Sequence, residues 1–276
     1  MTWTPEHRRR YAPAITEVVR ANAIVRLAVT VDVIDPPART GRPRLWSTLV
    51  TLQALWWLCR AGAAWKLPPA ASPPRRTIGG RLERWARLEV LERALAALNA
   101  CLRLARGRER RPTAGILDTR SVRTGPQAGP RGYDAAKGVK GRKRVLLVDT
   151  EGLVQALRVV PASVQDRDTP AVLEPELAAG PPCTLRKVWA DLAFAGERAT
   201  TPMARHGIEL ELVGRKGKGG FAVEPRRWKV EQTFGCLMRY RRLQVDHEGG
   251  TGMSRIMTLL ASLFMAGARF ERQIMS

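Results

Sequence analysis

The sequence predicts an α/β fold in which an all-α N-terminal region precedes a mixed five-stranded sheet with flanking helices. Two patterns support this prediction. Up to about residue 110 the apolar residues recur at helical spacing, whereas after Pro112 short aliphatic and β-branched runs alternate with turns and helices. The chain has 276 residues, of which 45% are hydrophobic, so it can bury one large core or a medium core and a small one. We therefore divide it into a helical region, 1–110, and an α/β region, 111–276.

Three segments of the N-terminal region have the spacing of amphipathic helices: Leu45–Arg60, Thr77–Trp85 and Leu88–Leu104. Gly62 is expected to end the first helix, and Thr77 to cap the second. Arg81 and Arg84 lie on the surface of the second helix, and three helices with a basic middle one suggest a helix-turn-helix-like unit. We expect both arginines to contact DNA; the alternative is a plain helical bundle with a solvated arginine face.

The region after Pro112 is expected to contain five strands, at Gly115–Val122, Arg144–Asp149, Leu153–Val160, Leu185–Ala190 and Ile208–Val213. The helices expected with them are Thr169–Ala179, a short helix that ends at Met203–Gly207, Arg227–Leu243 and Met253–Arg272. The order is three strands, a helix, a strand, a helix, a strand and then helices. This is the order of the RNase H-like fold.

The charge indicates a polyanionic partner. Lys and Arg number 47 against 25 Asp and Glu, which gives a net charge of +22. Nucleic acid is the usual polyanion, and neutralising its phosphates supplies most of the non-specific affinity. Residues 1–110 carry 20 basic and 8 acidic side chains, so this part is the best candidate for sequence-directed DNA contact. Residues 111–180 are nearly balanced, with 11 basic and 8 acidic side chains, as expected where carboxylates must hold cations.

Three carboxylates stand where such cations would bind. Asp118 lies inside the first strand, next to the apolar Ile116 and Leu117, a costly position unless it is paired or binds a cation. Asp191 directly follows the apolar end of the fourth strand, and Glu231 lies early in the long helix. Carboxylates suit Mg²⁺, and two such ions roughly 4 Å apart can activate the attacking oxygen and stabilise the leaving oxygen of a phosphodiester. We predict that these three residues are catalytic and bind two Mg²⁺ or Mn²⁺ ions.

Basic side chains are expected to hold DNA phosphates around this site. Arg227, Glu231 and Arg242 share one face of the expected long helix, so the two arginines would flank the carboxylate. The alternative for Arg227 and Glu231 is an i,i+4 surface ion pair. Further phosphate contacts are expected from Lys140, Arg142, Lys143, Arg144 and Arg239. The alternative for the run at 140–144 is a solvated face.

Other classes of protein are disfavoured. The four cysteines form no CxxC pair and no histidine has zinc-ligand spacing, so a structural zinc site is not expected. The N-terminus lacks the apolar segment of a signal peptide, and no apolar stretch is long and continuous enough to span a bilayer. We expect a cytoplasmic protein of a bacterium, associated with the nucleoid.

Several segments in colinear order resemble a known family. They are LDTRSVRT around Asp118, GPRGYDAAKGVKGRKRVLLVDTEGL at Gly129–Leu153, VVPASVQDRD at Val159–Asp168, VWADLAFAG at Val188–Gly196 and PRRWKVEQTFGCLMRYRRL at Pro225–Leu243. The chain resembles bacterial insertion-sequence transposases of the DDE type, in the group numbered five. The resemblance implies that Asp118, Asp191 and Glu231 form the metal-binding triad of an RNase H-like core. It also implies binding of double-stranded DNA, both terminal inverted repeats and target, by a homodimer or a larger synaptic assembly.

Two alternatives remain open from the sequence. The chain departs from the family pattern at Leu192–Phe194, Gln232 and Cys236. A decayed or repurposed copy would be a DNA-binding protein without catalysis. An RNase H-like nuclease would cut DNA without joining it. The predicted function is that of a DNA transposase that binds transposon ends and catalyses metal-dependent cleavage and strand transfer.

Overall fold

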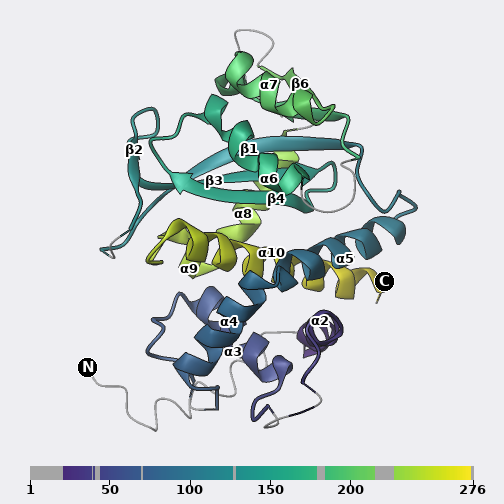
Figure 1. Ribbon diagram of the computed structural model, residues 1–276, viewed down its shortest axis with the longest axis vertical. Coiled ribbons are helices and arrows are strands. Elements are labelled where there is room, and N and C mark those ends of the chain that lie inside the picture. Colours follow the sequence, from purple (N-terminus) through teal and green to yellow (C-terminus); the bar gives the residue numbers. More distant parts are fainter. Residues whose placement is uncertain are drawn as a thin grey trace. The chain divides into compact units, whose positions relative to one another are not determined.

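Two compact units make up the chain in the computed structural model, which describes residues 21–38, 40, 44–69, 71–126, 129–178, 184–214 and 227–274 (Figure 1). The first unit contains the residues up to Arg108, the segment Arg239–Leu243 and the chain from Ile256 onward. The second contains Glu109–Met238 and Gln244–Arg255. A single division at residue 110 therefore does not describe these units, because the chain returns to the first unit twice near its C-terminus.

The first unit is helical. Its helices before residue 108 are α2 (Ala21–Ile34), α3 (Thr48–Ala61), α4 (Arg75–Arg87) and α5 (Val90–Leu104). Ser47 begins α3 by accepting a 3.3 Å hydrogen bond from the Val50 N–H, and Gly62 ends it with a left-handed φ of 68°. The C-cap expected at Gly62 is thus confirmed.

Two predictions for these helices were wrong. Helix α4 begins at Arg75, directly after Pro74, so Thr77 is not its N-cap. Helix α2 was not predicted; its alternating valines and alanines mix strand-forming and helix-forming residues. Buried faces hold the bundle together: Leu82 and Trp85 of α4 and Leu91 of α5 are inaccessible or nearly so. The apolar spacing seen in the sequence is therefore the core-facing stripe.

The second unit is built on a mixed sheet. Its strands are β1 (Ala114–Arg123), β2 (Gly132–Asp134), β3 (Val139–Asp149), β4 (Val154–Pro161), β5 (Lys187–Ala190) and β6 (Glu209–Leu212). The order is β2-β3-β1-β5-β6, and β4 pairs with β3. Strand β1 is antiparallel to β3 and parallel to β5, and β5 is parallel to β6. The five predicted strands are confirmed, in the RNase H-like arrangement, and β2 is an addition.

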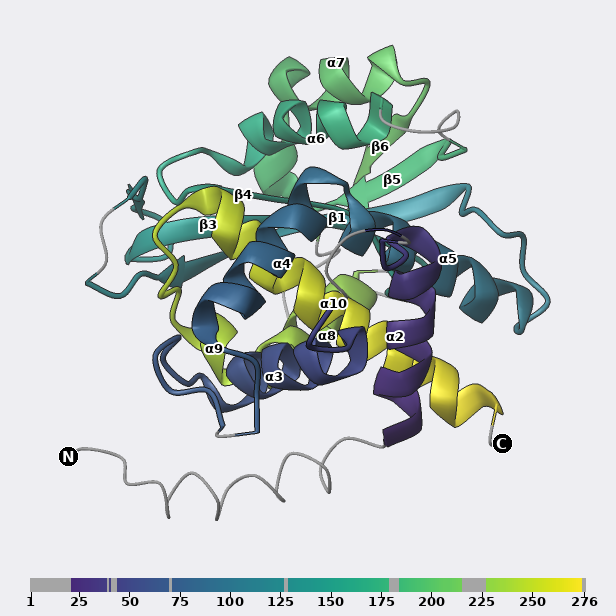
Figure 2. The same cartoon turned by 60° about the horizontal axis from the view of Figure 1, so that its bottom comes forward.

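Helices cover both faces of this sheet. Helices α6 (Thr169–Ala178) and α7 (Glu197–Arg205) lie on one face and α8 (Trp228–Leu237) on the other (Figure 2). Leu117, Val145 and Leu147 belong to the core cluster shared with α6 and α7. Because strand side chains alternate, Asp118 points to the opposite face, the one that α8 covers. Helix α8 is held there by buried Val230 and Phe234.

Two local differences from prediction concern the elements near the expected site. Strand β3 begins at Val139 rather than at Arg144, so the basic run lies within the sheet. The long helix expected at Arg227–Leu243 is two helices, α8 and α9 (Arg241–Gln244), separated by a turn. The turn arises because Tyr240 is buried and stacks on Phe264, with ring centroids 6.5 Å apart, in the first unit.

The last helix, α10, runs over Thr251–Ile274 and confirms the one predicted at Met253–Arg272. Within the described ranges, every helix is too short or too polar to traverse a bilayer.

Candidate functional site

Asp118 lies in the middle of β1. Its Cα pairs with that of Leu146 in β3, which makes Asp118 part of the central pair of strands. Its Oδ1 atom accepts a 2.7 Å hydrogen bond from the Thr119 N–H, so a backbone group orients the carboxylate. The two apolar residues before it, Ile116 and Leu117, are buried and hold the strand in place. Asp118 is therefore a rigid group on the α8 face of the sheet.

Asp191 follows the last residue of β5. It is the N-cap of a short 3₁₀ helix, η2 (Leu192–Phe194), and its Oδ1 accepts a 2.9 Å hydrogen bond from the Ala193 N–H. Phe194 of this turn is fully buried in the core. The residues that replace the family's usual sequence after the second aspartate thus form an ordered turn that anchors Asp191. The second carboxylate oxygen, Oδ2, remains available for a cation.

Glu231 lies in the first turn of α8. A negative side chain at this end of a helix is stabilised by the N–H groups of the first turn. Its side chain is 61% exposed, far more than the 31% of Asp191. Helix α8 is fixed to the sheet below it: the buried Thr233 hydroxyl donates a 3.1 Å hydrogen bond to the Gly152 carbonyl in the β3–β4 turn. The backbone of Glu231 is thus positioned while its carboxylate can move.

Arg227 connects two of the three carboxylates. Its Nη2 atom lies 3.7 Å from Asp191 Oδ2 and 3.8 Å from Glu231 Oε1. The Arg227 side chain is 17% exposed, but that of Glu231 is 61% exposed, so their contact is the i,i+4 ion pair that the sequence offered as an alternative. One cationic group therefore holds both carboxylates where a bound cation would be expected.

Burial raises the pKa of Asp118 to about 6. The neighbouring charge of Asp191 acts in the same direction, whereas the Thr119 N–H and the cations Arg227 and Lys137 lower this pKa. Asp118 therefore shares an electrostatic environment with Asp191 and Arg227. A buried carboxyl beside a second carboxylate favours the approach of further positive charge.

The donor set suits a hard divalent cation, although its oxygens are not gathered into a finished metal site. Among the described residues, no three His, Cys, Asp or Glu side chains are close enough together to hold a metal ion. The exposed Glu231 carboxylate and the intervening Arg227 guanidinium account for this. Carboxylate oxygens are the ligands that Mg²⁺ and Mn²⁺ prefer. The three residues therefore fit such ions once Arg227 gives way to them.

The basic run of β3 is mostly internal, which corrects the expected phosphate-binding surface. Arg142, Lys143 and Arg144 are 1%, 3% and 1% exposed. Arg142 pairs with the buried Asp246 at 3.0 Å, and Lys143 with Asp166 at 2.6 Å. These three side chains are therefore too buried to form the phosphate-binding surface that the sequence predicted. Lys140 of the same strand is exposed and stays a prediction.

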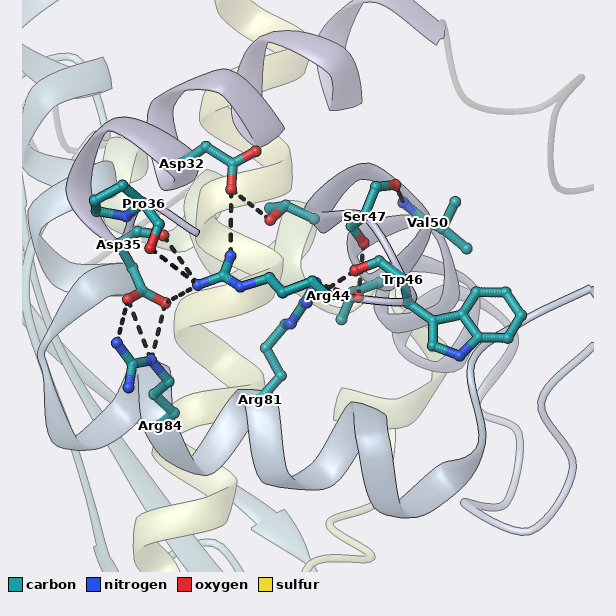
Figure 3. A network of polar contacts seen from close by, with 11 residues as sticks. Asp32, Asp35, Pro36, Arg44, Trp46, Ser47, Val50, Arg81 and Arg84 are labelled. Atoms are coloured by element: carbon teal, nitrogen blue, oxygen red, sulfur yellow. Dashed lines mark hydrogen bonds and ion pairs between the residues drawn. The ribbon is translucent and has the colours of Figure 1, made fainter. Parts of the chain in front are cut away.

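Arg81 and Arg84 organise the first unit (Figure 3). Arg84 donates from Nε and Nη2 to the carboxylate of Asp35, with the shortest contact at 2.7 Å. Arg81 donates to the Thr51 hydroxyl at 2.8 Å and to the Trp46 carbonyl at 2.9 Å. These contacts tie α4 to the end of α2 and the start of α3. Both guanidinium groups thus have structural partners within the first unit, and DNA contact by either of them stays a prediction.

Arg239 and Arg242 follow the break after α8, so they do not continue the helix face of Glu231. Arg242 is 4% exposed; it donates to the Ala63 carbonyl and lies over the Trp65 ring, 5.3 Å from the centroid. Arg239 has an exposed side chain, and its carbonyl accepts a 2.6 Å hydrogen bond from Arg60. Arg242 is thus structural, and DNA contact by Arg239 stays a prediction.

Lys137 is a charged neighbour of Asp118 that was not among the residues predicted from the sequence. It acts on the pKa of Asp118, yet it lies in the turn between β2 and β3, 19 positions along the chain. The signal in the sequence was a lysine followed by Gly138, in a turn of the sheet whose strand β1 carries Asp118. It was overlooked because the charged run that follows it is longer.

The comparisons with known proteins agree with this geometry. A family model described as the transposase DDE domain matches residues 109–265, which is more than half of the chain. A Burkholderia cepacia protein named as a transposase for insertion sequence element IS402 is 31% identical over 143 residues, 48% of this chain and 64% of that protein. The chain therefore covers less than two thirds of that relative's length. The sheet order, the three carboxylates and the family match lead to one conclusion: the chain belongs to the family of transposase DDE domains.

Proposed function

We propose that the protein is a DNA transposase that binds the ends of a mobile element, cuts them and joins them to target DNA. The observation that supports the proposal is the position of the Arg227 guanidinium, which contacts both Asp191 and Glu231 in the first turn of α8. The charges of Arg227 and Asp191 also act on the pKa of Asp118. The family match supports the same reaction class. Residues for a metal-dependent phosphodiester reaction are thus present on rigid strands and a fixed helix.

Asp118, Asp191 and Glu231 would hold the metal, Mg²⁺ or Mn²⁺. Two bound ions would supply activation of the attacking oxygen and stabilisation of the leaving oxygen. Asp118 and Asp191 are each oriented by a backbone N–H, so they contribute fixed oxygens. The Glu231 side chain is exposed, so its carboxylate could join the metal site after those of Asp118 and Asp191. Two fixed carboxylates and one exposed carboxylate suit a site that must admit both a metal ion and a DNA strand.

Arg227 has two tasks in this proposal. Without metal, its charge offsets the mutual repulsion of Asp191 and Glu231. When a metal is bound, Asp191 and Glu231 would hold it instead, and the Arg227 guanidinium could then donate to a DNA phosphate as a bidentate partner. In the cutting step, water attacks the phosphorus and the bond to the 3′ oxygen breaks, which frees a 3′-hydroxyl. In the joining step, that hydroxyl attacks a target phosphodiester, and the target's own 3′ oxygen leaves.

The partners follow from this reaction. They are double-stranded DNA of the element's terminal inverted repeats, double-stranded target DNA and a second copy of the chain, because two ends must be held together. The chain has 47 basic and 25 acidic residues, and this excess of positive charge supports association with DNA. The proposed location is the bacterial nucleoid.

The test is a strand-transfer assay. A labelled duplex that carries the repeats flanking the gene would be mixed with supercoiled plasmid, Mg²⁺ and the full chain. Asp191→Asn is the test variant, and Glu174→Gln is its control for the loss of one negative charge, because Glu174 belongs to α6, on the sheet face opposite to α8, and pairs with Arg205 at 3.3 Å. Joined products from the wild type and the control, with none from Asp191→Asn, are expected. Cutting without joining would indicate a nuclease, and binding without chemistry would indicate a DNA-binding relic.

A further inference from the structure

The packed face of helix α4 is fixed by apolar and polar contacts within the first unit. Ile78, Leu82 and Trp85 lie on this face and are inaccessible to solvent. Arg81 and Arg84 flank it and point toward the start of α3 and the end of α2 (Figure 3). The orientation of α4 in the first unit is therefore determined, and its opposite face is the one that a partner can reach.

This opposite face of α4 is exposed and carries more positive than negative charge. Successive residues of an α-helix are about 100° apart, so the residues on the side away from Trp85 are Arg76, Gly80, Glu83 and Arg87. Arg75 lies beside this stripe, and all five residues are exposed. Three arginines against one glutamate give the solvent face of α4 a net charge of +2.

Arg75 and Arg76 differ from the two arginines on the flank of α4. Neither side chain forms an ion pair or a hydrogen bond with another described residue. They are the first two residues of the helix, where a positive charge opposes the helix dipole, and no acidic residue in that turn compensates them. Pro74, which precedes them, provides no side-chain cap. These charges therefore do not stabilise the described part of the fold.

Two glycines follow in the next turn of the helix. Gly79 and Gly80 lie inside α4, where glycine destabilises a helix relative to alanine. Apart from the backbone of the helix itself, a Cβ atom at either position would meet no atom of the described residues within 4 Å, so packing does not require glycine there. Residues that weaken an element without an internal reason are expected where a protein meets its partner. A helix surface without side chains lets that partner come close to the helix.

We propose that the solvent face of α4 binds the sugar–phosphate backbone of double-stranded DNA, with Arg75 and Arg76 contacting phosphates and Gly80 lying against the strand. The inference rests on the proposed function, which makes DNA the partner. A guanidinium group can donate to two phosphate oxygens at once, so exposed arginines suit this contact. The glycines allow the strand to approach the helix closely. Contacts of this kind position DNA without reading its sequence.

Removal of charge tests the two arginines. Arg75→Gln/Arg76→Gln is compared with Arg198→Gln/Arg205→Gln, which removes the same charge from α7 in the second unit. Fluorescence anisotropy in EDTA measures binding of the full chain to a labelled duplex with the repeats flanking the gene, and to a duplex of scrambled sequence. The first variant should bind both duplexes at least about fivefold more weakly than the control, and its plot of log affinity against log salt should be less steep by about 2. Its thermal midpoint should not fall, because the helix dipole no longer opposes two charges.

A side chain at Gly80 tests the close approach of the strand. Gly80→Leu should raise the thermal midpoint, because leucine favours a helix and the position has open space. It should also bind both duplexes at least about threefold more weakly, since the side chain would hold the phosphates away from the arginines. Gly252→Leu is the matched control, because Gly252 of α10 is also an exposed helical glycine with open space. A gain in stability together with a loss of binding cannot arise from unfolding.

The competing outcomes give different results. If the arginine variant matches its control in affinity and salt dependence, or Gly80→Leu binds DNA as well as Gly252→Leu does, the inference is overturned, whatever the strand-transfer assay shows. If the binding differences appear but the wild type joins no DNA, the proposed function falls and the DNA-binding face of α4 stands. If the variants change the oligomeric state in sedimentation and leave DNA binding unchanged, the inference is overturned in favour of a surface that binds a second copy of the chain.

Discussion

Arg142 Nη1 lies 3.0 Å from Asp246 Oδ1, and both side chains are only 1% exposed. The same carboxylate accepts hydrogen bonds from the Glu248 N–H and the Ser254 hydroxyl, so it anchors the segment after α9 to the edge of the sheet. A buried ion pair of this kind contributes to the fold chiefly through the cost of breaking it.

Asp246→Asn should therefore destabilise the protein strongly. The change leaves the Arg142 cation buried without its charge partner, and a loss of about 3–5 kcal/mol is expected. Urea unfolding followed by tryptophan fluorescence measures it. Glu174→Gln is the control, because it removes half of an exposed pair with Arg205 and should cost no more than about 1 kcal/mol. Equal losses in the two variants would contradict the structural role of the buried pair.

Asp118→Asn should stabilise the metal-free protein at neutral pH. The Asp118 pKa is raised from 3.8 to about 6, so the native state binds this proton more tightly than the unfolded chain does. The free energy of unfolding should therefore fall as the pH rises from about 4 to 6 and stay lower above it. Asparagine removes this loss, which amounts to at most about 3 kcal/mol for a shift of about two pKa units.

Thermal unfolding in EDTA at a series of pH values measures this effect. The wild-type midpoint should decline through that pH window, and the Asp118→Asn midpoint should decline less. Adding Mn²⁺ at neutral pH should raise the wild-type midpoint and leave the variant nearly unchanged. A variant less stable than the wild type at neutral pH in EDTA would show that the carboxylate is not electrostatically disfavoured.

Arg227→Gln should tighten metal binding. The guanidinium contacts both Asp191 and Glu231, so it competes with a divalent ion for the same oxygens. Two partly exposed pairs of this kind are worth little each, and a gain of about two- to fivefold in Mn²⁺ affinity is expected. Isothermal titration calorimetry measures it, with Arg205→Gln as a control for the change in net charge. Weaker binding by Arg227→Gln would mean that Arg227 assembles the carboxylates instead.

Arg84→Gln should destabilise the first unit. Arg84 donates two hydrogen bonds to Asp35, whose side chain is 3% exposed, and this contact holds the pKa of Asp35 below its usual value. Its removal should cost about 1–3 kcal/mol, because a buried carboxylate loses a charged donor. Arg87→Gln, at an exposed position of the same helix, is the control. Thermal unfolding at neutral pH, where Asp35 is ionised, should give a lower midpoint for Arg84→Gln than for Arg87→Gln. Equal midpoints would contradict the structural role of Arg84.

The long strands could be predicted from local patterns, whereas the roles of the three carboxylates stay a prediction. The apolar runs around Leu117, Leu146 and Leu157 each form a buried strand, as their composition indicated. The helix break after Leu237 could not be predicted, because the residues on both sides favour a helix. It depends on where Tyr240 and Arg242 find buried partners, and those lie far away in the chain.

The sequence by itself determined the order of the strands and helices along the chain and the excess of positive charge, and it predicts Asp118, Asp191 and Glu231 as site residues. These are properties of short segments and of composition, in which side-chain periodicity and strand ends carry the information. Only the tertiary structure decided which cations are structural. Arg142 meets Asp246 across 104 positions of the chain, and Arg84 meets Asp35 across 49. Arg142 and Lys143, which were predicted to contact phosphates, are buried because distant carboxylates compensate their charges, whereas Lys137 keeps an exposed ammonium group beside Thr119.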